Sequence, residues 1–373
     1  MSCTFLATAA FGLEGVAAAE LKRMGLKARG ENGGARFEGE PLDAFRANLC
    51  LRTADRVLMI LREDKARSFE ELFQLVQDIP WERYLSRDAS VHVSGKCVRS
   101  QLMSIRDCQS ITKKAIVRRL GQKWRMERLP ENGPEYPIEV AVVNDVARIT
   151  LDMTGEALNR RGYRTWNGEA PIRETLAAAL LEISPWRRGM RLYDPCCGTG
   201  TLLIEAALKA IQRPAGIRRS FACEKYPFLD KGEMQRVRAE MAVQETDAAF
   251  DIAGSDISPE ALELCGRHIR QAGLEGKISV HQLDLRTLTL EGEPGLFLCN
   301  PPYGERLSDQ AGARKLYRDM GEMWCRHPGW ALCVITADPG FERAFGKRAD
   351  KKRRLYNGRL ECEFMTFYAP KQG

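Results

Sequence analysis

The stretch MRLYDPCCGTGTLLIEAALKAI, residues 190–211, constrains the fold more than any other part of the chain. A short apolar run leads into a Gly-x-Gly turn at Gly198 and Gly200, and a helix with an apolar face follows at once. Glycine lets the backbone approach a ligand closely, and the first turn of a helix offers free N–H groups. The pattern predicts one strand, one turn and one helix of a parallel α/β sheet, with a ligand above the turn; a tight turn without a ligand is the alternative.

This turn does not match a dinucleotide-binding turn. Leu203 stands where a third glycine would be, and the acidic residue expected roughly 20 residues further on is absent. An acid comes later, because Asp256 ends a strand predicted over residues 251–255, where a carboxylate can accept both hydroxyls of a ribose. Asp284 ends another predicted strand within VHQLDLRTL, at a position suited to an adenine amino group.

A third strand, Leu296–Cys299, runs straight into Asn-Pro-Pro-Tyr. Prolines cannot donate to a sheet or continue into a helix, so the strand must end there. The side-chain carbonyl of Asn300 and the backbone carbonyl of Pro301 can accept both N–H bonds of an exocyclic amine, while Pro302 helps to fix the loop. Tyr303 offers a face on which an unpaired or flipped base can stack. Guanine and adenine both carry such an amine, and a proline-rich turn without chemistry is the alternative.

The first third of the chain has a small α+β pattern without a catalytic constellation. The predicted strands are residues 4–8, 56–61 and 91–96, and the predicted helices are 13–24, 70–77 and 111–120. Residues 138–145 and 146–152 predict a hairpin that turns at Asn144-Asp145. At 373 residues the chain is longer than one core usually supports, so we expect two or three domains.

The net charge of +7 fits a polyanionic partner without requiring one. A basic stretch has Glu127 as its nearby acid and carries Trp124 among its cations. A helix with such a face can follow phosphates, and a merely solvated helix is the alternative. The cations proposed to contact nucleic acid are Lys113, Lys114, Arg118, Arg119 and Lys123.

The twelve cysteines include no C-x-x-C pair, which indicates reduced thiols and argues against a zinc or disulfide framework. The four histidines, His92, His268, His281 and His327, show no metal spacing and are expected to be structural or surface residues. No window approaches the roughly 18 uninterrupted apolar residues of a membrane helix. We therefore expect a cytoplasmic protein without a metal or a membrane partner, either a monomer or a dimer.

The segments DPCCGTGTLLIEAA, GSDIS, LDL and NPPYGERL resemble S-adenosylmethionine-dependent methyltransferases that carry an N-terminal THUMP RNA-binding domain, in the branch that modifies guanine in ribosomal RNA. SQLMSIRDCQSITKKAIVRRL resembles the helical region of that THUMP domain. LDMTGEALNRRGYR and APIRETLAAALL resemble the linker and the helix that covers the cofactor. The resemblance extends over nearly the whole chain.

The resemblance implies an α/β fold: a Rossmann-like class I methyltransferase sheet, mostly parallel, with an antiparallel C-terminal hairpin that turns at Asn357-Gly358. An α+β ferredoxin-like and THUMP region would precede it. The implied domains are a ferredoxin-like region (1–60), a THUMP domain (61–155), a linker (156–170) and a methyltransferase domain (171–373).

The resemblance also implies the cofactor S-adenosyl-L-methionine. Asp256 would hold its ribose and Asp284 would approach its adenine. The residues carried over by position to the cofactor site are Asp194, Cys196, Gly198, Thr199, Gly200, Asp256, Ile257, Asp284 and Thr175. The stretch 212–250, which is rich in Arg and Lys, is either part of the substrate face or a solvated insertion.

The implied activity is methyl transfer to the 2-amino group of a guanine in RNA, with 23S ribosomal RNA as the expected partner. An adenine-N6 methyltransferase acting on DNA or RNA is one alternative, because the Asn-Pro-Pro-Tyr motif suits either amine. A non-catalytic RNA-binding or ribosome assembly factor is another, although Asp256, Asp284 and Asn300 argue against a degenerate site.

Overall fold

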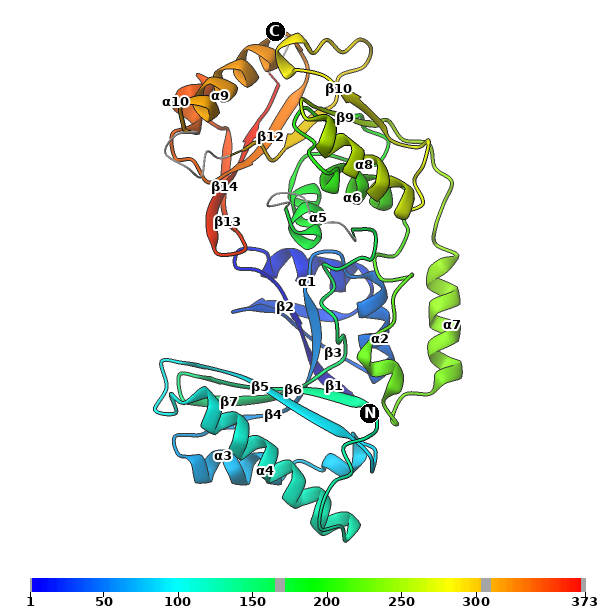
Figure 1. The fold of residues 1–373 in the computed structure, drawn as a ribbon, viewed down its shortest axis with the longest axis vertical. Helices are drawn as coiled ribbons and strands as arrows, with labels where there is room; N and C mark the ends of the chain where they lie inside the picture. Colours follow the sequence, from blue (N-terminus) through cyan, green and yellow to red (C-terminus); the bar gives the residue numbers. More distant parts are fainter. Residues whose placement is uncertain (1, 165–171, 303–309, 370–373) are drawn as a thin grey trace. The chain divides into compact units, whose positions relative to one another are not determined.

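The computed structural model describes residues 2–164, 172–302 and 310–369, and its contacts divide the chain into two compact units (Figure 1). The N-terminal unit comprises residues 1–9, 17–158 and 219–241. The C-terminal unit comprises residues 10–16, 159–218 and 242–373. The two units are therefore interleaved in sequence: residues 10–16 belong to the C-terminal unit, and residues 219–241 belong to the N-terminal unit.

The N-terminal unit is built on one seven-stranded sheet with the order β2-β3-β1-β4-β7-β6-β5. Only β5 and β6 pair in parallel among these strands. β4 passes through the predicted boundary at residues 60/61, so the ferredoxin-like and THUMP regions share this sheet. The elements of this region are β1 (Cys3–Thr8), α1 (Glu14–Arg23), β2 (Lys27–Glu31), β3 (Gly34–Gly39), α2 (Pro41–Cys50), β4 (Arg56–Lys65), α3 (Phe69–Gln77), β5 (Ser90–Val98), α4 (Ile105–Trp124), β6 (Glu135–Val143) and β7 (Val146–Asp152).

The predicted hairpin at Asn144-Asp145 is confirmed. The two residues have φ angles of 52° and 62°, and Val143 pairs with Val146 across the turn. Positive φ at both central residues is what the two-residue hairpin turn requires, and Asn and Asp tolerate it well. The sequence analysis missed β2, β3 and α2; β2 and β3 are short, and β2 has Ala28 as its single apolar side chain.

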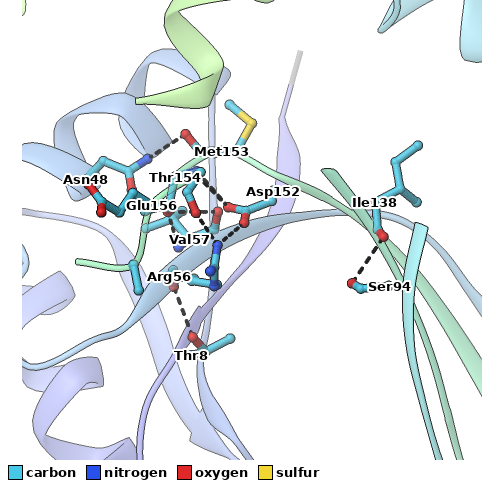
Figure 2. Close-up of polar contacts among 12 residues, drawn as sticks. Thr8, Asn48, Arg56, Val57, Ser94, Ile138, Asp152, Met153, Thr154 and Glu156 are labelled. Carbon is cyan, nitrogen blue, oxygen red and sulfur yellow. Dashed lines mark hydrogen bonds and ion pairs between the residues drawn. The ribbon is translucent and has the colours of Figure 1, made fainter. Parts of the chain in front are cut away.

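A buried polar network holds the chain where it leaves β7 (Figure 2). The Thr154 hydroxyl donates to Asn48 Oδ1 at 2.6 Å and accepts from the backbone N–H of Val57 at 2.7 Å. Asn48 in turn donates to the carbonyl of Met153 at 3.3 Å. Asp152 pairs with Arg56. Because Thr154 and Asn48 are fully buried, each of these polar groups depends on its partner in place of water.

Residues 219–241 belong to the N-terminal unit, although they follow α6 (Thr201–Ala210), a helix of the C-terminal unit. They contain a 3-10 turn (Ala222–Lys225) and α7 (Lys231–Ala242). Ala222 donates its N–H to the Thr154 carbonyl at 3.1 Å, and the Tyr226 ring stacks on Tyr136 with centroids 4.9 Å apart. This part of the stretch 212–250 is therefore integral to the N-terminal unit and not a solvated insertion; its contact with substrate stays a prediction.

The C-terminal unit is built on a second seven-stranded sheet with the order β10-β9-β8-β11-β12-β14-β13. The first five strands pair in parallel, and β14 and β13 add an antiparallel edge, which confirms the predicted fold class. The elements are α5 (Glu174–Ile183), β8 (Leu192–Asp194), α6 (Thr201–Ala210), β9 (Ile252–Asp256), α8 (Pro259–Gln271), β10 (Ser279–Gln282), β11 (Leu296–Cys299), α9 (Gln310–Cys325), β12 (Ala331–Thr336), α10 (Phe341–Phe345), β13 (Lys351–Asn357) and β14 (Leu360–Phe367).

The C-terminal hairpin turns one residue later than predicted. Asn357 still pairs with Leu360, so the two central residues of the turn are Gly358 and Arg359. Gly358 has a φ of +66°, the left-handed conformation that glycine adopts without strain. The sequence predicted the turn to within one residue, but Asn357 is the last paired residue of β13 and not a central residue of the turn.

The core of the C-terminal unit surrounds its central strands. Every residue of β11 and of β12 is buried, as expected of parallel strands covered on both faces. Phe297 of β11 stacks on Trp330 with centroids 4.4 Å apart, and Phe341 packs beside Phe345 at 5.4 Å. These aromatic contacts hold the strands whose ends carry the candidate site.

The network of Figure 2 includes the Thr154 hydroxyl. Removing that hydroxyl should therefore affect stability differently from removing the hydroxyl of Thr150, a buried threonine outside the network. Thr154→Val should lower the free energy of unfolding by about 2 to 3 kcal/mol, because it leaves the Asn48 carbonyl and the Val57 N–H without their partner. Thr150→Val is the matched control: the Thr150 hydroxyl is buried and has no hydrogen-bond partner among the described residues. Its loss should be neutral or stabilising. Urea denaturation followed by circular dichroism measures both, and equal effects would contradict this account.

Candidate active site

The candidate site lies where the strand order of the second sheet reverses. β8 pairs in parallel with β9 on one side and with β11 on the other, with Asp194 opposite Gly254 and Leu296 opposite Leu192. Ligands of such sheets bind at the carboxyl ends of the strands, at the point where the order reverses. The structure therefore brings the turn after Asp194, the strand-end Asp256 and the loop beginning at Asn300 to one edge of the sheet.

The Gly-x-Gly turn connects β8 to α6 as predicted, and its two glycines have different reasons to be glycine. Gly200 has a φ of +83° and precedes α6 as its N-cap; a Cβ there would lie 2.4 Å from the sulfur of Cys265. Gly198 has a φ of +52°, but a Cβ there would meet nothing within 4 Å. Gly200 is thus required by internal packing, whereas Gly198 leaves open space next to the turn.

Asp256 is fixed by backbone groups at the end of β9. Its Oδ2 accepts the N–H of Gly198 at 2.8 Å, and its Oδ1 accepts the N–H of Ser258 at 3.0 Å. Each carboxylate oxygen can accept a further hydrogen bond, so a ligand with two neighbouring hydroxyls fits this group. The next residue, Ile257, is 66% exposed and offers an apolar surface beside it. The free acceptor sites of Asp256 fit the two hydroxyls of a ribose, and the exposed side chain of Ile257 fits the base attached to that ribose.

Asp194 is only 1% exposed, and its Oδ1 accepts the N–H of Cys196 at 3.0 Å. Burial raises the pKa of Asp194 well above its usual value, and the nearby charge of Asp256 raises it further. A carboxyl group in this situation favours a cationic neighbour, because the positive charge stabilises its ionised form. The turn therefore suits a ligand that carries positive charge.

Asp284 follows β10 and begins a 3-10 turn (Leu285–Thr287). Arg286 donates its backbone N–H to Oδ1 at 2.9 Å and its side-chain Nε to Oδ2 at 2.8 Å. The hydrogen bond from the Arg286 side chain is the main cause that lowers the pKa of Asp284. The sequence analysis did not foresee this partner, which orients the carboxylate and competes with any ligand for its oxygens.

The remaining cofactor candidates lie on α5 and in the glycine turn. Thr175 is buried on α5, and Cys196 and Thr199 are half-buried in the glycine turn. The Thr199 carbonyl accepts a hydrogen bond from Nδ1 of the buried His268, which gives that histidine the structural role expected of it. Within the described parts of the chain no group of three or more His, Cys, Asp or Glu side chains has the arrangement of a metal site.

The loop after β11 is anchored by a residue that the sequence analysis missed. Asn300 is half-buried, Pro301 is buried and Pro302 is exposed, while Tyr303 lies outside the described residues. The hydroxyl of Tyr317, a fully buried residue of α9, donates to the Pro302 carbonyl at 3.1 Å. No local sequence signal marks Tyr317, because its partner is 15 residues away in the chain.

The predicted nucleic-acid contacts lie on α4, and the structure divides them into two groups. Lys113 pairs with Glu131 at 2.9 Å and Arg119 pairs with Glu82 at 2.8 Å, so tertiary contacts supply acids that the sequence neighbourhood lacked. The remaining members of the set are exposed on the helix: Lys114, Arg118 and Lys123. The guanidinium of Arg118 also lies 5.6 Å from the ring centre of Phe73.

In the parts of the chain that the structure describes, every helix is too short or too polar to span a lipid bilayer.

Comparisons with known proteins agree with this architecture. Residues 161–366 match the family described as "RMKL-like, methyltransferase domain", residues 4–58 match the "RlmL ferredoxin-like domain" and residues 66–152 match the "THUMP domain". The "Putative RNA methyltransferase YpsC" of Bacillus subtilis is 36% identical and aligns over 98% of this chain and 96% of its own length.

Two further relatives bear on the active site. The "Ribosomal RNA large subunit methyltransferase K/L" of Syntrophotalea carbinolica is 33% identical over 97% of this chain, which spans only 53% of that protein's length. The crystal structure of "SMU.472, a putative methyltransferase complexed with SAH" is 39% identical, with a TM-score of 0.94, and the match covers 100% of this chain and 99% of that one.

The glycine turn with its two strand-end carboxylates fits the cofactor of these proteins: the chain belongs to the family of RMKL-like methyltransferases, with ferredoxin-like and THUMP domains before the catalytic domain, and uses S-adenosylmethionine as its methyl donor.

Proposed function

We propose that this protein methylates the exocyclic 2-amino group of a guanine in RNA, with large-subunit (23S) ribosomal RNA as the substrate. The observation that carries the proposal is the position of Asn300 and Pro301 at the carboxyl end of β11, beside the glycine turn that follows β8. The THUMP domain and the names of the RNA-modifying relatives support RNA as the substrate. The anchored Asn-Pro-Pro loop supports an amine as the acceptor.

S-adenosylmethionine supplies an electrophilic methyl group when it is bound. We infer that Asp256 holds its ribose hydroxyls, because both carboxylate oxygens are already oriented by backbone N–H groups. Asp284 would accept from the adenine amino group beside its contact with Arg286. Asp194, with Thr175 and the glycine turn, would frame the cationic methionine end, which favours the ionised form of that buried carboxyl.

Asn300 and Pro301 would prepare the amine for attack. The lone pair of an exocyclic amine is delocalised into the base, so the nitrogen is a poor nucleophile. A side-chain carbonyl and a backbone carbonyl that accept its two N–H bonds draw it toward tetrahedral geometry and stabilise the positive charge that develops on it. In this role Asn300 is an acceptor and not a general base. Tyr317 would support it by holding the Pro302 carbonyl, so that the loop keeps its orientation.

The N-terminal unit carries a second feature that supports an RNA substrate. A cavity of about 400 Å³ is lined by Cys97, residues 99–103 and Asp145. Arg99 in its lining suits a phosphate, and Met103, 80% exposed, suits an unpaired base. The segment is held by Asp145, whose Oδ1 accepts the Gln101 N–H at 2.8 Å. With the exposed cations of α4, the cavity supports RNA binding by this unit.

Labelled methyl transfer tests the proposal directly. RNA and DNA from cells that lack this protein are incubated with the purified chain and radiolabelled S-adenosylmethionine, and the nucleosides are then separated. We expect label in N2-methylguanosine from ribosomal RNA. Label in N6-methyladenine would establish the adenine alternative, and RNA binding without transfer of label would establish a non-catalytic factor.

Asn300→Ala should slow the methyl-transfer step by roughly two to three orders of magnitude, because the amine loses one of its two acceptors in the transition state. Binding of cofactor and RNA should stay close to that of the unaltered protein. Asn300→Asp is the matched control, since it keeps an acceptor oxygen at the same position and should lose much less. Single-turnover assays at saturating cofactor and RNA measure the step, and an unchanged rate for Asn300→Ala would refute its role.

The two glycines predict separable effects. Gly198→Ala should weaken binding of S-adenosylhomocysteine while leaving stability within about 1 kcal/mol, because its methyl group enters open space next to the turn. Gly200→Ala should instead destabilise the C-terminal unit by more than that, since its methyl group would overlap the Cys265 sulfur. Calorimetry and thermal unfolding separate the two quantities. Normal ligand affinity in Gly198→Ala would show that the cofactor does not use this space.

Tyr317→Phe should lower the single-turnover rate by about 2- to 12-fold, the equivalent of one hydrogen bond of 0.5 to 1.5 kcal/mol, and leave cofactor affinity unchanged. Tyr136→Phe is the control, because it removes another tyrosine hydroxyl that contacts Ser86 in the N-terminal unit. It should alter stability without altering the transfer step. Equal rates for both variants would mean that the Pro302 contact does not position the loop.

A further inference from the structure

One segment of the C-terminal unit is strongly basic. Residues 343–359 contain eight basic residues and one acidic residue, a net charge of +7. The whole chain has 57 basic and 50 acidic residues, which is also a net charge of +7. The rest of the chain is therefore neutral on balance. A cluster of one sign on one segment favours a partner of the opposite sign.

This segment runs from α10 to the turn after β13, and β13 is the edge strand of the sheet (Figure 1). Four successive cations occupy the start of the strand, Lys351 to Arg354. Because side chains alternate along a strand, these cations project from both faces of the edge. Leu355, the next residue, is buried and ties the strand to the core.

The carboxylates near these cations hold them only weakly. Lys352 pairs with Glu342 and, at 3.5 Å, with Glu363. Arg354 lies 4.0 Å from Glu361. Ion pairs between solvent-exposed side chains contribute little to stability, so phosphate groups can replace these carboxylates at small cost. The edge therefore remains available to an anionic polymer.

An exposed aromatic ring stands beside the cations. Phe11 is 55% exposed, meets Tyr356 edge-to-face with centroids 5.8 Å apart, and lies 5.6 Å from the guanidinium of Arg354. The segment that carries it is fixed along β13, because Arg353 donates to the carbonyl of Gly12 at 2.5 Å. Cations that follow a backbone next to an aromatic face are the means by which proteins bind unpaired nucleotides.

We propose that residues 343–359 and Phe11, the β13 edge, bind the substrate RNA on the C-terminal unit, with phosphates on the exposed Lys351, Lys352 and Arg354 and an unpaired base on Phe11. This inference rests on the proposed function, because it names where that substrate contacts the catalytic domain. Charges also keep edge strands from pairing with other chains, so the experiment must distinguish the two roles.

The test compares two triple variants of the full chain. Lys351→Gln/Lys352→Gln/Arg354→Gln removes three charges from the β13 edge and keeps Arg353, which fixes the Phe11 segment, while Arg267→Gln/Arg270→Gln/Lys277→Gln removes three from α8 and the loop after it. The probe is a short fluorescent single-stranded RNA, titrated at several salt concentrations. Loss of three phosphate contacts should reduce the slope of log affinity against log salt by about 2. The control variant should keep the slope of the unaltered protein.

Phe11→Ala should weaken the same binding by about 10-fold, whereas Phe11→Tyr should retain it, because stacking needs the ring. Affinity for S-adenosylhomocysteine should be unchanged in every variant, which verifies that the catalytic domain is folded. An edge variant with the slope of the control would overturn the proposal. So would an edge variant that self-associates but binds RNA normally, because its charges would then only protect the strand.

The outcome for the unaltered protein separates this inference from the proposed function. A chain that methylates RNA, and whose edge variant binds RNA as tightly as before, would overturn the β13 edge alone. An unaltered chain that neither binds RNA nor transfers methyl groups to it would overturn the proposed function, and this inference with it.

Discussion

β8 pairs in parallel with β9 and with β11, and the candidate active site depends on these two pairings. Since the strand order reverses at β8, the turns after β8 and β11 lie at the point where ligands of such sheets bind. The hydrogen bond from Gly198 to Asp256 then joins the end of β8 to the end of β9. Burial of the central strands makes this geometry costly to change, so three short segments far apart in the sequence hold a fixed arrangement.

Charge is distributed according to the proposed ligands. The cofactor end of the sheet has three carboxylates, Asp194, Asp256 and Asp284, and burial raises the pKa of the first. A cofactor with a sulfonium and an ammonium group relieves the cost of ionising that residue. Clusters of cations lie elsewhere, on α4 and in residues 343–359 of the C-terminal unit. We therefore propose that the protein offers negative charge to a cationic cofactor and positive charge to a polyanionic substrate.

The two units are compact in space but interleaved in sequence. Residues 10–16 contribute Phe11 to the C-terminal unit, and residues 219–241 contribute Tyr226 and α7 to the N-terminal unit. A cut between the predicted linker and the methyltransferase domain would deprive both segments of their packing partners. Domain boundaries drawn from sequence order alone do not describe such a chain, because packing, not chain order, decides to which core a segment belongs.

The sequence alone determined the local features: β11 with its limits at Leu296 and Cys299, the hairpin at Asn144-Asp145 and the glycine turn before α6. Apolar runs, turn residues and prolines act on the conformation of only a few neighbouring residues, so their effect can be predicted from the sequence. Only the tertiary structure decided the contact of Tyr317 with Pro302, the pairing of Arg119 with Glu82 and the packing of residues 219–241. These depend on how distant segments meet during folding, and no local pattern encodes which partners burial will bring together.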